Sequence, residues 1–239
     1  MSNAELLHFA DNRELARAAA VQWAGEIGTV PKPPSPYCVA LSGGRIAKDF
    51  FECVVDESRE NRSPLSSVHF FWGDERCVPP DDPESNFASA RELLLSPLSI
   101  SPDKIHRVRG EDNPESAASQ AAAELQLIAP ASPSGQPVFD LIFLGLGEDG
   151  HVASLFPGES EQLVNDERVY RAVVAVKPPP RRITLGYAAI AAAKHVWVLA
   201  SGSGKETALR ESLAPKGRTP LARLLTLRSH TRVFTDIAI

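Results

Sequence analysis

The stretch FDLIFLGLGEDGHVASLFPG, residues 139–158, carries the clearest fold signal in the chain. An apolar run over residues 138–147 predicts a buried strand, because near-continuous apolar runs are typical of parallel sheets that are covered on both faces. The run closes on glycines, and Asp149, Gly150 and His151 follow directly. The sequence therefore predicts a strand that delivers a carboxylate and a histidine to its carboxyl end.

Three other predicted strands end in the same way, in the polar, glycine-bearing segments LSGGR (41–45), WGDER (72–76) and ASGSGK (200–205). Helical patterns separate these strands, and this alternation predicts a doubly wound, mostly parallel α/β sheet with helices on both faces. In such open sheets, ligands bind beyond the carboxyl ends of the strands. We therefore expect the four segments to converge on one edge and to form a site there.

The remaining pattern fits a single α/β domain over residues 1–239, with no internal repeat and no long linker. Helices are predicted at 11–27, 46–58, 84–95, 114–129, near 184–194 and at 205–212. Further strands are predicted at 105–108, 168–176 and 231–235, with the proline-rich segment 177–182 as a loop.

The composition favours a globular domain over a nucleic-acid-binding, membrane-spanning or secreted protein. The 239 residues are 43% hydrophobic and 23% charged, which is ordinary for a globular domain, and the net charge of −5 argues against a broad nucleic-acid surface. No apolar stretch of membrane-spanning length or secretory-signal pattern is visible, so a cytoplasmic protein without a membrane partner is expected. The cysteines Cys38, Cys53 and Cys77 lack metal-ligand spacing, and free thiols in a reducing compartment are expected.

Two glycine motifs resemble nucleotide-binding loops but do not meet their requirements. GLGEDG matches GxGxxG, yet Pro157 and Gly158 stop the helix that must follow, and Glu148 and Asp149 would repel a pyrophosphate. GSGKE lacks the first glycine and the Ser or Thr of a phosphate-binding P-loop. Neither motif therefore predicts a nucleotide cofactor.

The LSGG turn reads instead as an anion cradle. Ser42, Gly43 and Gly44 lie between a strand and a helix, where small residues let backbone N–H groups approach a phosphate and the helix N-terminus adds partial positive charge. Lys205, after another strand, and Arg182, after three prolines, could contribute cationic donors. The alternatives are an ordinary tight turn and solvated surface charges.

Four residues are candidates for the chemistry at this edge. His151 can take a proton from water near neutral pH, and Asp149 can orient its ring. Asp74 and Arg76 follow a strongly apolar strand, although a solvated turn would also explain them. The alternative for His151 is a satisfied turn histidine. No second histidine or cysteine stands at i+3 or i+4, so no metal site is predicted.

Several blocks resemble the 6-phosphogluconolactonase family, in the family's order and from about residue 39 to about residue 209: WGDERCVPPDDPESNFASAR, FDLIFLGLGEDGHVASLFPG, PPPRRITL and GSGKE. The resemblance implies hydrolysis of 6-phospho-D-glucono-1,5-lactone, a sugar-phosphate lactone, without metal or organic cofactor. It also implies a fold shared with glucosamine-6-phosphate deaminases, ribose-5-phosphate isomerases and CoA-transferases.

Carried over by position, the resemblance makes His151 the general base. Asp149, Asp74 and Arg76 match positions of the family's catalytic site. The positions that match the family's phosphate-binding side are Ser42, Gly43, Gly44, Arg182 and Lys205. The chain departs from the family at Arg45, where a small hydroxyl residue is usual. Two rivals remain: a sugar-phosphate isomerase or deaminase of the same fold, and a sugar-phosphate-binding regulator that has lost the chemistry.

Overall fold

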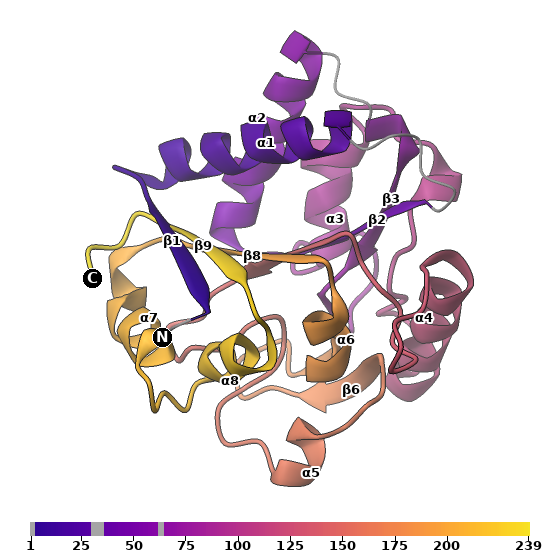
Figure 1. The fold of residues 1–239 in the computed structure, drawn as a ribbon. Coiled ribbons are helices and arrows are strands. Elements are labelled where there is room, and N and C mark those ends of the chain that lie inside the picture. Colours follow the sequence, from indigo (N-terminus) through magenta and orange to yellow (C-terminus); the bar gives the residue numbers. More distant parts are fainter. Residues whose placement is uncertain (1–2, 30–35, 62–64) are drawn as a thin grey trace.

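A six-stranded parallel sheet forms the centre of the computed structural model, which describes residues 3–29, 36–61 and 65–239 (Figure 1). Its strand order is β1-β9-β8-β5-β2-β3, and every neighbouring pair is parallel. The strands are β1 (Ala4–His8), β2 (Tyr37–Leu41), β3 (Val68–Trp72), β5 (Leu141–Gly145), β8 (His195–Ala200) and β9 (Thr231–Thr235). The predicted doubly wound parallel sheet is confirmed.

Helices cover both faces of this sheet (Figure 1). On one face lie α1 (Asn12–Thr29) and α2 (Arg45–Asn61); on the other lie α6 (Tyr187–Ala192), α7 (Glu206–Leu213) and α8 (Pro220–Leu227). Under α1 and α2, the Phe143 ring of β5 packs 5.3 Å from Trp23 and 4.5 Å from Phe50, centroid to centroid. The apolar run that predicts β5 is thus the centre of the core.

A second, three-stranded antiparallel sheet was not predicted. Its order is β4 (Asp74–Arg76), β7 (Arg181–Leu185) and β6 (Tyr170–Val174). The predicted strand through 67–76 breaks at Gly73, whose N–H donates to Leu41 O of the main sheet while its carbonyl accepts from Leu185 N of the second. The DER segment therefore follows the carboxyl end of β3 but belongs to another sheet.

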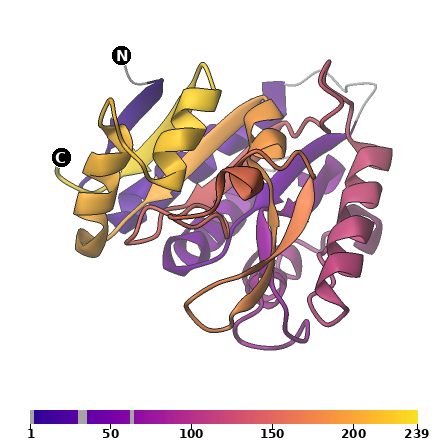
Figure 2. The same cartoon turned by 90° about the horizontal axis from the view of Figure 1, so that it is seen from below.

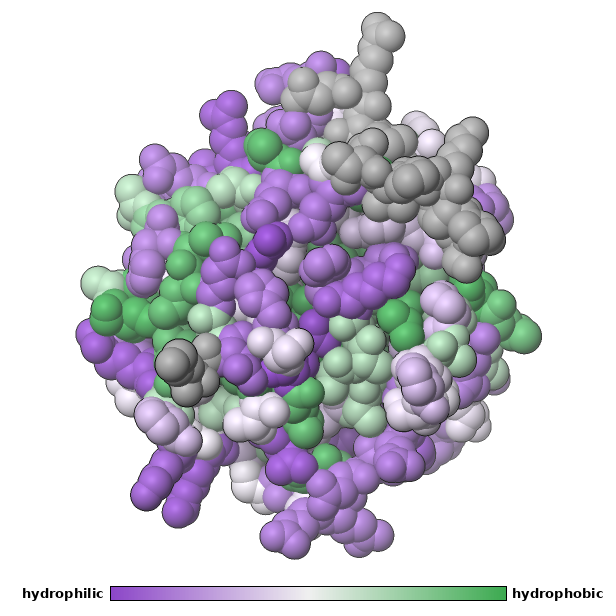
Figure 3. Space-filling view, viewed as in Figure 1, coloured by the Kyte–Doolittle hydropathy of each residue, from purple (hydrophilic) through white to green (hydrophobic). Residues whose placement is uncertain are grey.

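Helix α4 (Pro114–Ile128) packs beside the β6–β7 hairpin (Figure 2). The remaining helical segments are α3 (Asn86–Ala90), which continues as a π-helical turn at Arg91–Leu95, α5 (Glu161–Val164), and 3-10 turns at Leu65–Ser67, Pro102–Lys104 and Ser203–Lys205. None of the described helices is both long enough and apolar enough to cross a bilayer. Hydrophilic side chains cover much of the face drawn in Figure 3, interrupted by scattered hydrophobic patches.

Several predicted boundaries were wrong. Residues 105–108 form no strand, only an isolated bridge between Ile105 and Phe70. The proline-rich loop gives way to β7 at Arg181, and the helix predicted near 184–194 is confined to Tyr187–Ala192. Strand β1 and helix α8 were not predicted; β1 is a largely exposed edge strand with little apolar pattern.

The buried carboxylate of Glu75 joins β4 to the start of α3. It accepts hydrogen bonds from the backbone N–H groups of Arg76 (2.7 Å), Asn86 (2.8 Å) and Phe87 (2.8 Å), and from the Ser85 hydroxyl (3.1 Å). Burial raises the pKa of Glu75, although the three backbone donors oppose that rise. The contact places an anion at the N-terminus of α3, where the backbone N–H groups have no partner within the helix.

Replacing that carboxylate should weaken the fold. Glu75→Gln is expected to lower the free energy of unfolding by about 1–3 kcal/mol, because the amide loses an acceptor and turns an NH₂ group toward backbone N–H donors. Urea unfolding measures the change, with Glu92→Gln as a control because Glu92 is exposed on the following turn. Equal unfolding midpoints for the two variants would contradict the anchoring role.

Candidate active site

The carboxyl ends of β2, β5 and β8 are neighbours at one edge of the main sheet. Ser42, directly after β2, accepts a hydrogen bond on its Oγ from the backbone N–H of Gly145 at the end of β5 (3.3 Å). Because all these strands are parallel, the turns that follow them lie on the same edge. The predicted convergence of the strand ends is confirmed by the strand order.

The two glycines of the LSGG turn meet different requirements. Gly44 has a φ of 95°, a left-handed conformation that side chains disfavour. At Gly43 the constraint is space, since a β-carbon there would overlap the Asn86 side-chain amide. Arg45 then opens the 17-residue helix α2. Sequence reasoning did not identify Asn86, which lies inside a predicted helix.

The glycines of GLGEDG serve a tight turn that carries His151. Gly147 N–H donates to His151 O (2.9 Å), and Gly150 N–H donates to Gly147 O (3.0 Å). A β-carbon at Gly147 would overlap the His151 ring, and one at Gly150, where φ is 82°, would meet Thr219. Gly147 therefore leaves room for the His151 ring, and Gly150 lets the turn pass close to Thr219.

Asp149 and His151 form a hydrogen-bonded pair. His151 Nδ1 lies 2.5 Å from Asp149 Oδ1, which also accepts the His151 backbone N–H at 3.2 Å. This contact assigns the proton of a neutral ring to Nδ1 and leaves Nε2 as the acceptor. Burial alone would raise the pKa of Asp149, but the hydrogen bond and charge of His151 outweigh it, so that pKa is lowered. Asp149 is thus held ionised beside the ring.

Phe156 links this pair to Arg182. Its ring centroid lies 5.0 Å from that of His151, and the Arg182 guanidinium lies 5.7 Å from the Phe156 centroid. Arg182 is buried, donates to Pro179 O (3.0 Å) and Lys177 O (3.3 Å), and stands opposite Arg76 in the β4–β7 pairing. Burial, and then the charge of Arg76, lower the pKa of Arg182.

Arg76 lies at the rim of this group, with 20% of its side chain exposed. Its Nη1 donates to Glu84 O (2.7 Å) and lies 3.6 Å from Glu84 Oε2, while its buried Nε has no partner in the described structure. Asp74 is held differently: it is 4% exposed, and both carboxylate oxygens accept hydrogen bonds, one from Asn86 Nδ2 (3.2 Å) and one from Ser154 Oγ (2.6 Å). Those contacts fix the Asp74 side chain in place.

Lys205 lies near a second cation, Arg45. Burial lowers its pKa, the nearby charge of Arg45 lowers it further, and Asp236 and Glu148 act in the opposite direction. The charges acting on Arg182 are instead those of Arg76, Asp74 and Glu84. Arg45 is thus the cation that acts on Lys205, and Arg76 is the cation that acts on Arg182.

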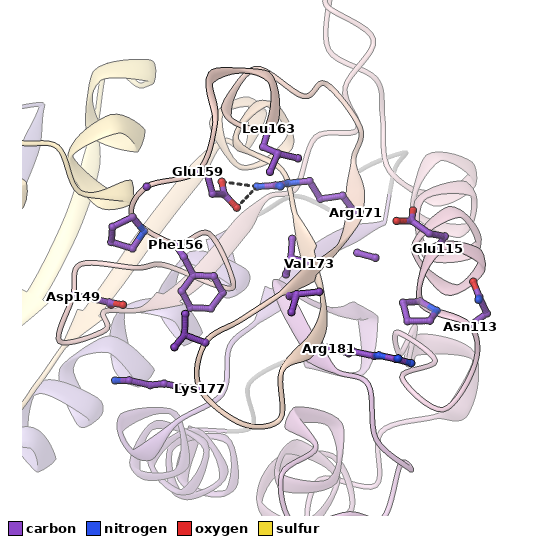
Figure 4. A pocket seen from close by; sticks show the side chains of 16 residues that line it. Asn113, Glu115, Asp149, Phe156, Glu159, Leu163, Arg171, Val173, Lys177 and Arg181 are labelled. Atoms are coloured by element: carbon purple, nitrogen blue, oxygen red, sulfur yellow. Dashed lines mark hydrogen bonds and ion pairs between the residues drawn. The ribbon is translucent and has the colours of Figure 1, made fainter.

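A cavity of about 840 Å³ borders the site but does not contain it (Figure 4). Asp149, Phe156 and Lys177 line one side, and Asn113, Glu115 and Arg181 line the other. The remaining predicted residues lie outside this cavity. Residues 3–29, 36–61 and 65–239 contain no cluster of three or more His, Cys, Asp or Glu side chains placed to hold a metal ion.

Comparisons with known proteins identify the family of this chain. A family model described as "Glucosamine-6-phosphate isomerases/6-phosphogluconolactonase" matches residues 10–234. The 6-phosphogluconolactonase of Treponema pallidum is 39% identical over 77% of this chain and 75% of its own length, and that of Streptomyces coelicolor is 33% identical over 89% and 84%.

Solved structures give the same result. The 6-phosphogluconolactonase of Trypanosoma brucei superposes with a TM-score of 0.85 at 29% identity, over 98% of this chain and 97% of that one. A monomeric glucosamine-6-phosphate deaminase, 19% identical, shares the fold with a TM-score of 0.79 over 98% and 97% of the two chains. The chain belongs to the glucosamine-6-phosphate isomerase/6-phosphogluconolactonase family.

Proposed function

We propose that this protein hydrolyses 6-phospho-D-glucono-1,5-lactone to 6-phospho-D-gluconate, the lactonase step of the oxidative pentose phosphate pathway. The observation that carries the proposal is the Asp149–His151 pair, set beside a glycine turn and two cationic groups at one sheet edge. The curated relatives named 6-phosphogluconolactonase, at 33–39% identity, support the same assignment.

The chemistry is a single attack by water. His151 Nε2 removes a proton from water as the oxygen adds to C1 of the lactone, and Asp149 stabilises the imidazolium that forms. Arg76, whose side chain is 20% exposed at the rim of the site, is a candidate donor to the oxyanion. When the tetrahedral intermediate collapses, the C1–ring oxygen bond breaks and the histidine returns its proton to that oxygen. No covalent enzyme intermediate is required.

The phosphate is assigned to the Ser42–Gly43–Gly44 turn, with Lys205 and Arg182 as cationic donors. Burial lowers the pKa of both cations, so both side chains are already partly withdrawn from water before the substrate arrives. A bound phosphate dianion would compensate each cation for the hydration that burial has removed. We assign this activity to one lactonase domain over 1–239, in the cytoplasm, with a sugar-phosphate substrate and no nucleic-acid or membrane partner.

One contact argues against the isomerase or deaminase alternative. Glu159 is the first carboxylate after His151, and both of its oxygens bind the buried Arg171 Nη2, at 2.8 and 2.7 Å. A carboxylate engaged in this ion pair is not free to assist a sugar ring opening. Fresh phosphogluconolactone, assayed for acid release, tests the proposal; ammonia release from glucosamine 6-phosphate, or binding without turnover, would favour the alternatives.

Removing the base should abolish most of the activity. His151→Ala is expected to lower kcat by about 10²–10⁴-fold, the usual contribution of a general base. Acid release is followed with the spontaneous hydrolysis rate subtracted, and circular dichroism confirms that the variant is folded. A kcat close to that of the wild type would remove His151 from the mechanism.

The rate should also depend on pH in one direction. A protonated imidazole cannot accept a proton, so kcat/KM is expected to fall as the medium is made more acidic. The profile is measured with the uncatalysed reaction in parallel at each pH. A flat profile would be incompatible with a histidine base.

The phosphate assignment predicts a difference between two substrates. Arg182→Ala and Lys205→Ala should each raise KM for the phosphorylated lactone by about one to two decades, from the loss of a charged hydrogen bond. With unphosphorylated gluconolactone the penalties should largely vanish, and Arg45→Ser, which restores the usual family residue, should have a smaller effect. Each residue is judged alone: equal penalties on both substrates would show that the substituted residue does not bind the phosphate.

A further inference from the structure

Asn86 occupies a position between two parts of the site that no sequence motif connects. It is the first residue of α3 and is 3% exposed. Its Nδ2 donates to Asp74 O at 2.9 Å and to Asp74 Oδ1 at 3.2 Å, while its backbone N–H is held by Glu75 at 2.8 Å. Both ends of this residue are therefore fixed to β4.

The other side of the amide faces the cradle. Asn86 Oδ1 is the atom that a β-carbon at Gly43 would meet first, followed by Asn86 Cγ. Of the two glycines, only Gly44 has a positive φ, so the requirement at Gly43 comes from this contact and not from the turn conformation. The amide thus sets how closely the LSGG turn approaches β4.

The connection continues to the loop that carries the base. Asp74 Oδ2 accepts the Ser154 hydroxyl at 2.6 Å, and Ser154, three residues after His151, is fully buried, with its N–H donating to Thr184 Oγ1 at 3.1 Å. A continuous series of contacts therefore runs from Gly43 through Asn86, Asp74 and Ser154 to the His151 loop. It joins the phosphate side of the site to the side that holds the base.

We propose that Asn86 is a positioning residue for the lactonase reaction, which sets the separation between the phosphate cradle and His151 by filling the space between Gly43 and Asp74. The inference rests on the proposed function. A substrate bound at both ends reacts only if the anchor and the base are correctly spaced, and small displacements are costly in rate. A substrate without phosphate is not anchored at the cradle and should depend less on that spacing.

The test is a double-mutant cycle between Gly43 and Asn86. Gly43→Ala should lower kcat/KM by about 100-fold because its methyl group meets the amide, and Asn86→Ala by about 10-fold; contacting residues typically show such non-additive coupling. In Gly43→Ala/Asn86→Ala the methyl group has room, so activity should recover at least about 10-fold relative to Gly43→Ala. The Asn86→Ala penalty should be smaller with unphosphorylated gluconolactone.

Asp140→Asn is the matched control. Asp140 precedes β5 at the opposite, amino-terminal edge of the main sheet, where it accepts the Cys38 backbone N–H at 2.8 Å and pairs with Lys194 at 2.7 Å. The variant should therefore lower the melting temperature while leaving the ratio of the two substrates unchanged. Additive penalties in the cycle, or equal loss on both substrates, would overturn the role of Asn86 while leaving an active wild type as a lactonase. An inactive wild type would overturn the proposed function and this inference with it.

Discussion

The hydrogen bonds between the Glu75 carboxylate and the start of α3 are the interaction on which the rest of the site depends. A buried charge is costly unless it is hydrogen-bonded, and here the donors are the N–H groups at the start of α3 and the Ser85 hydroxyl. Satisfying Glu75 therefore fixes where α3 begins. Once Asn86 is placed by that helix start, Asp74 and the LSGG turn are placed by Asn86.

The site is assembled from two sheets with different tasks. The parallel sheet supplies the strand ends that present Ser42, His151 and Lys205, and the antiparallel sheet supplies Arg76 and Arg182. Gly73 is the junction, since its two backbone groups bond to different sheets. In the proposed function, an acidic chain binds an anion through local cations, Arg182 and Lys205, which burial has partly desolvated.

The sequence predicted what depends on local pattern. Strands β2, β5 and β8 are uninterrupted apolar runs, and the glycine-bearing turns after them indicated the ligand-binding edge. The break at Gly73 was not predictable, because HFFWGDER reads as one continuous strand until a partner for each half is known. The first residues of β7 were predicted as a loop because prolines precede them. The edge strand β1 was not predicted because its polar residues interrupt the apolar pattern. The contacts of Gly43 with Asn86 and of Asp74 with Ser154 join distant segments, and no spacing in the sequence reports them. The roles assigned to the site residues stay predictions.

The pairing of β1 with β9 has a consequence for how the protein is made. The Arg232 side chain of β9 donates a hydrogen bond to Glu5 of β1, which lies 227 positions earlier in the sequence. Strand β1 therefore cannot pair in the sheet until β9 has been synthesised. During synthesis β1 has no neighbour in the sheet, and β8 keeps an open edge until β9 emerges from the ribosome. Contacts of such long range form slowly, and unpaired strand edges promote aggregation. Until β9 is added, both β1 and β8 therefore present unpaired backbone groups along an edge that the finished sheet covers.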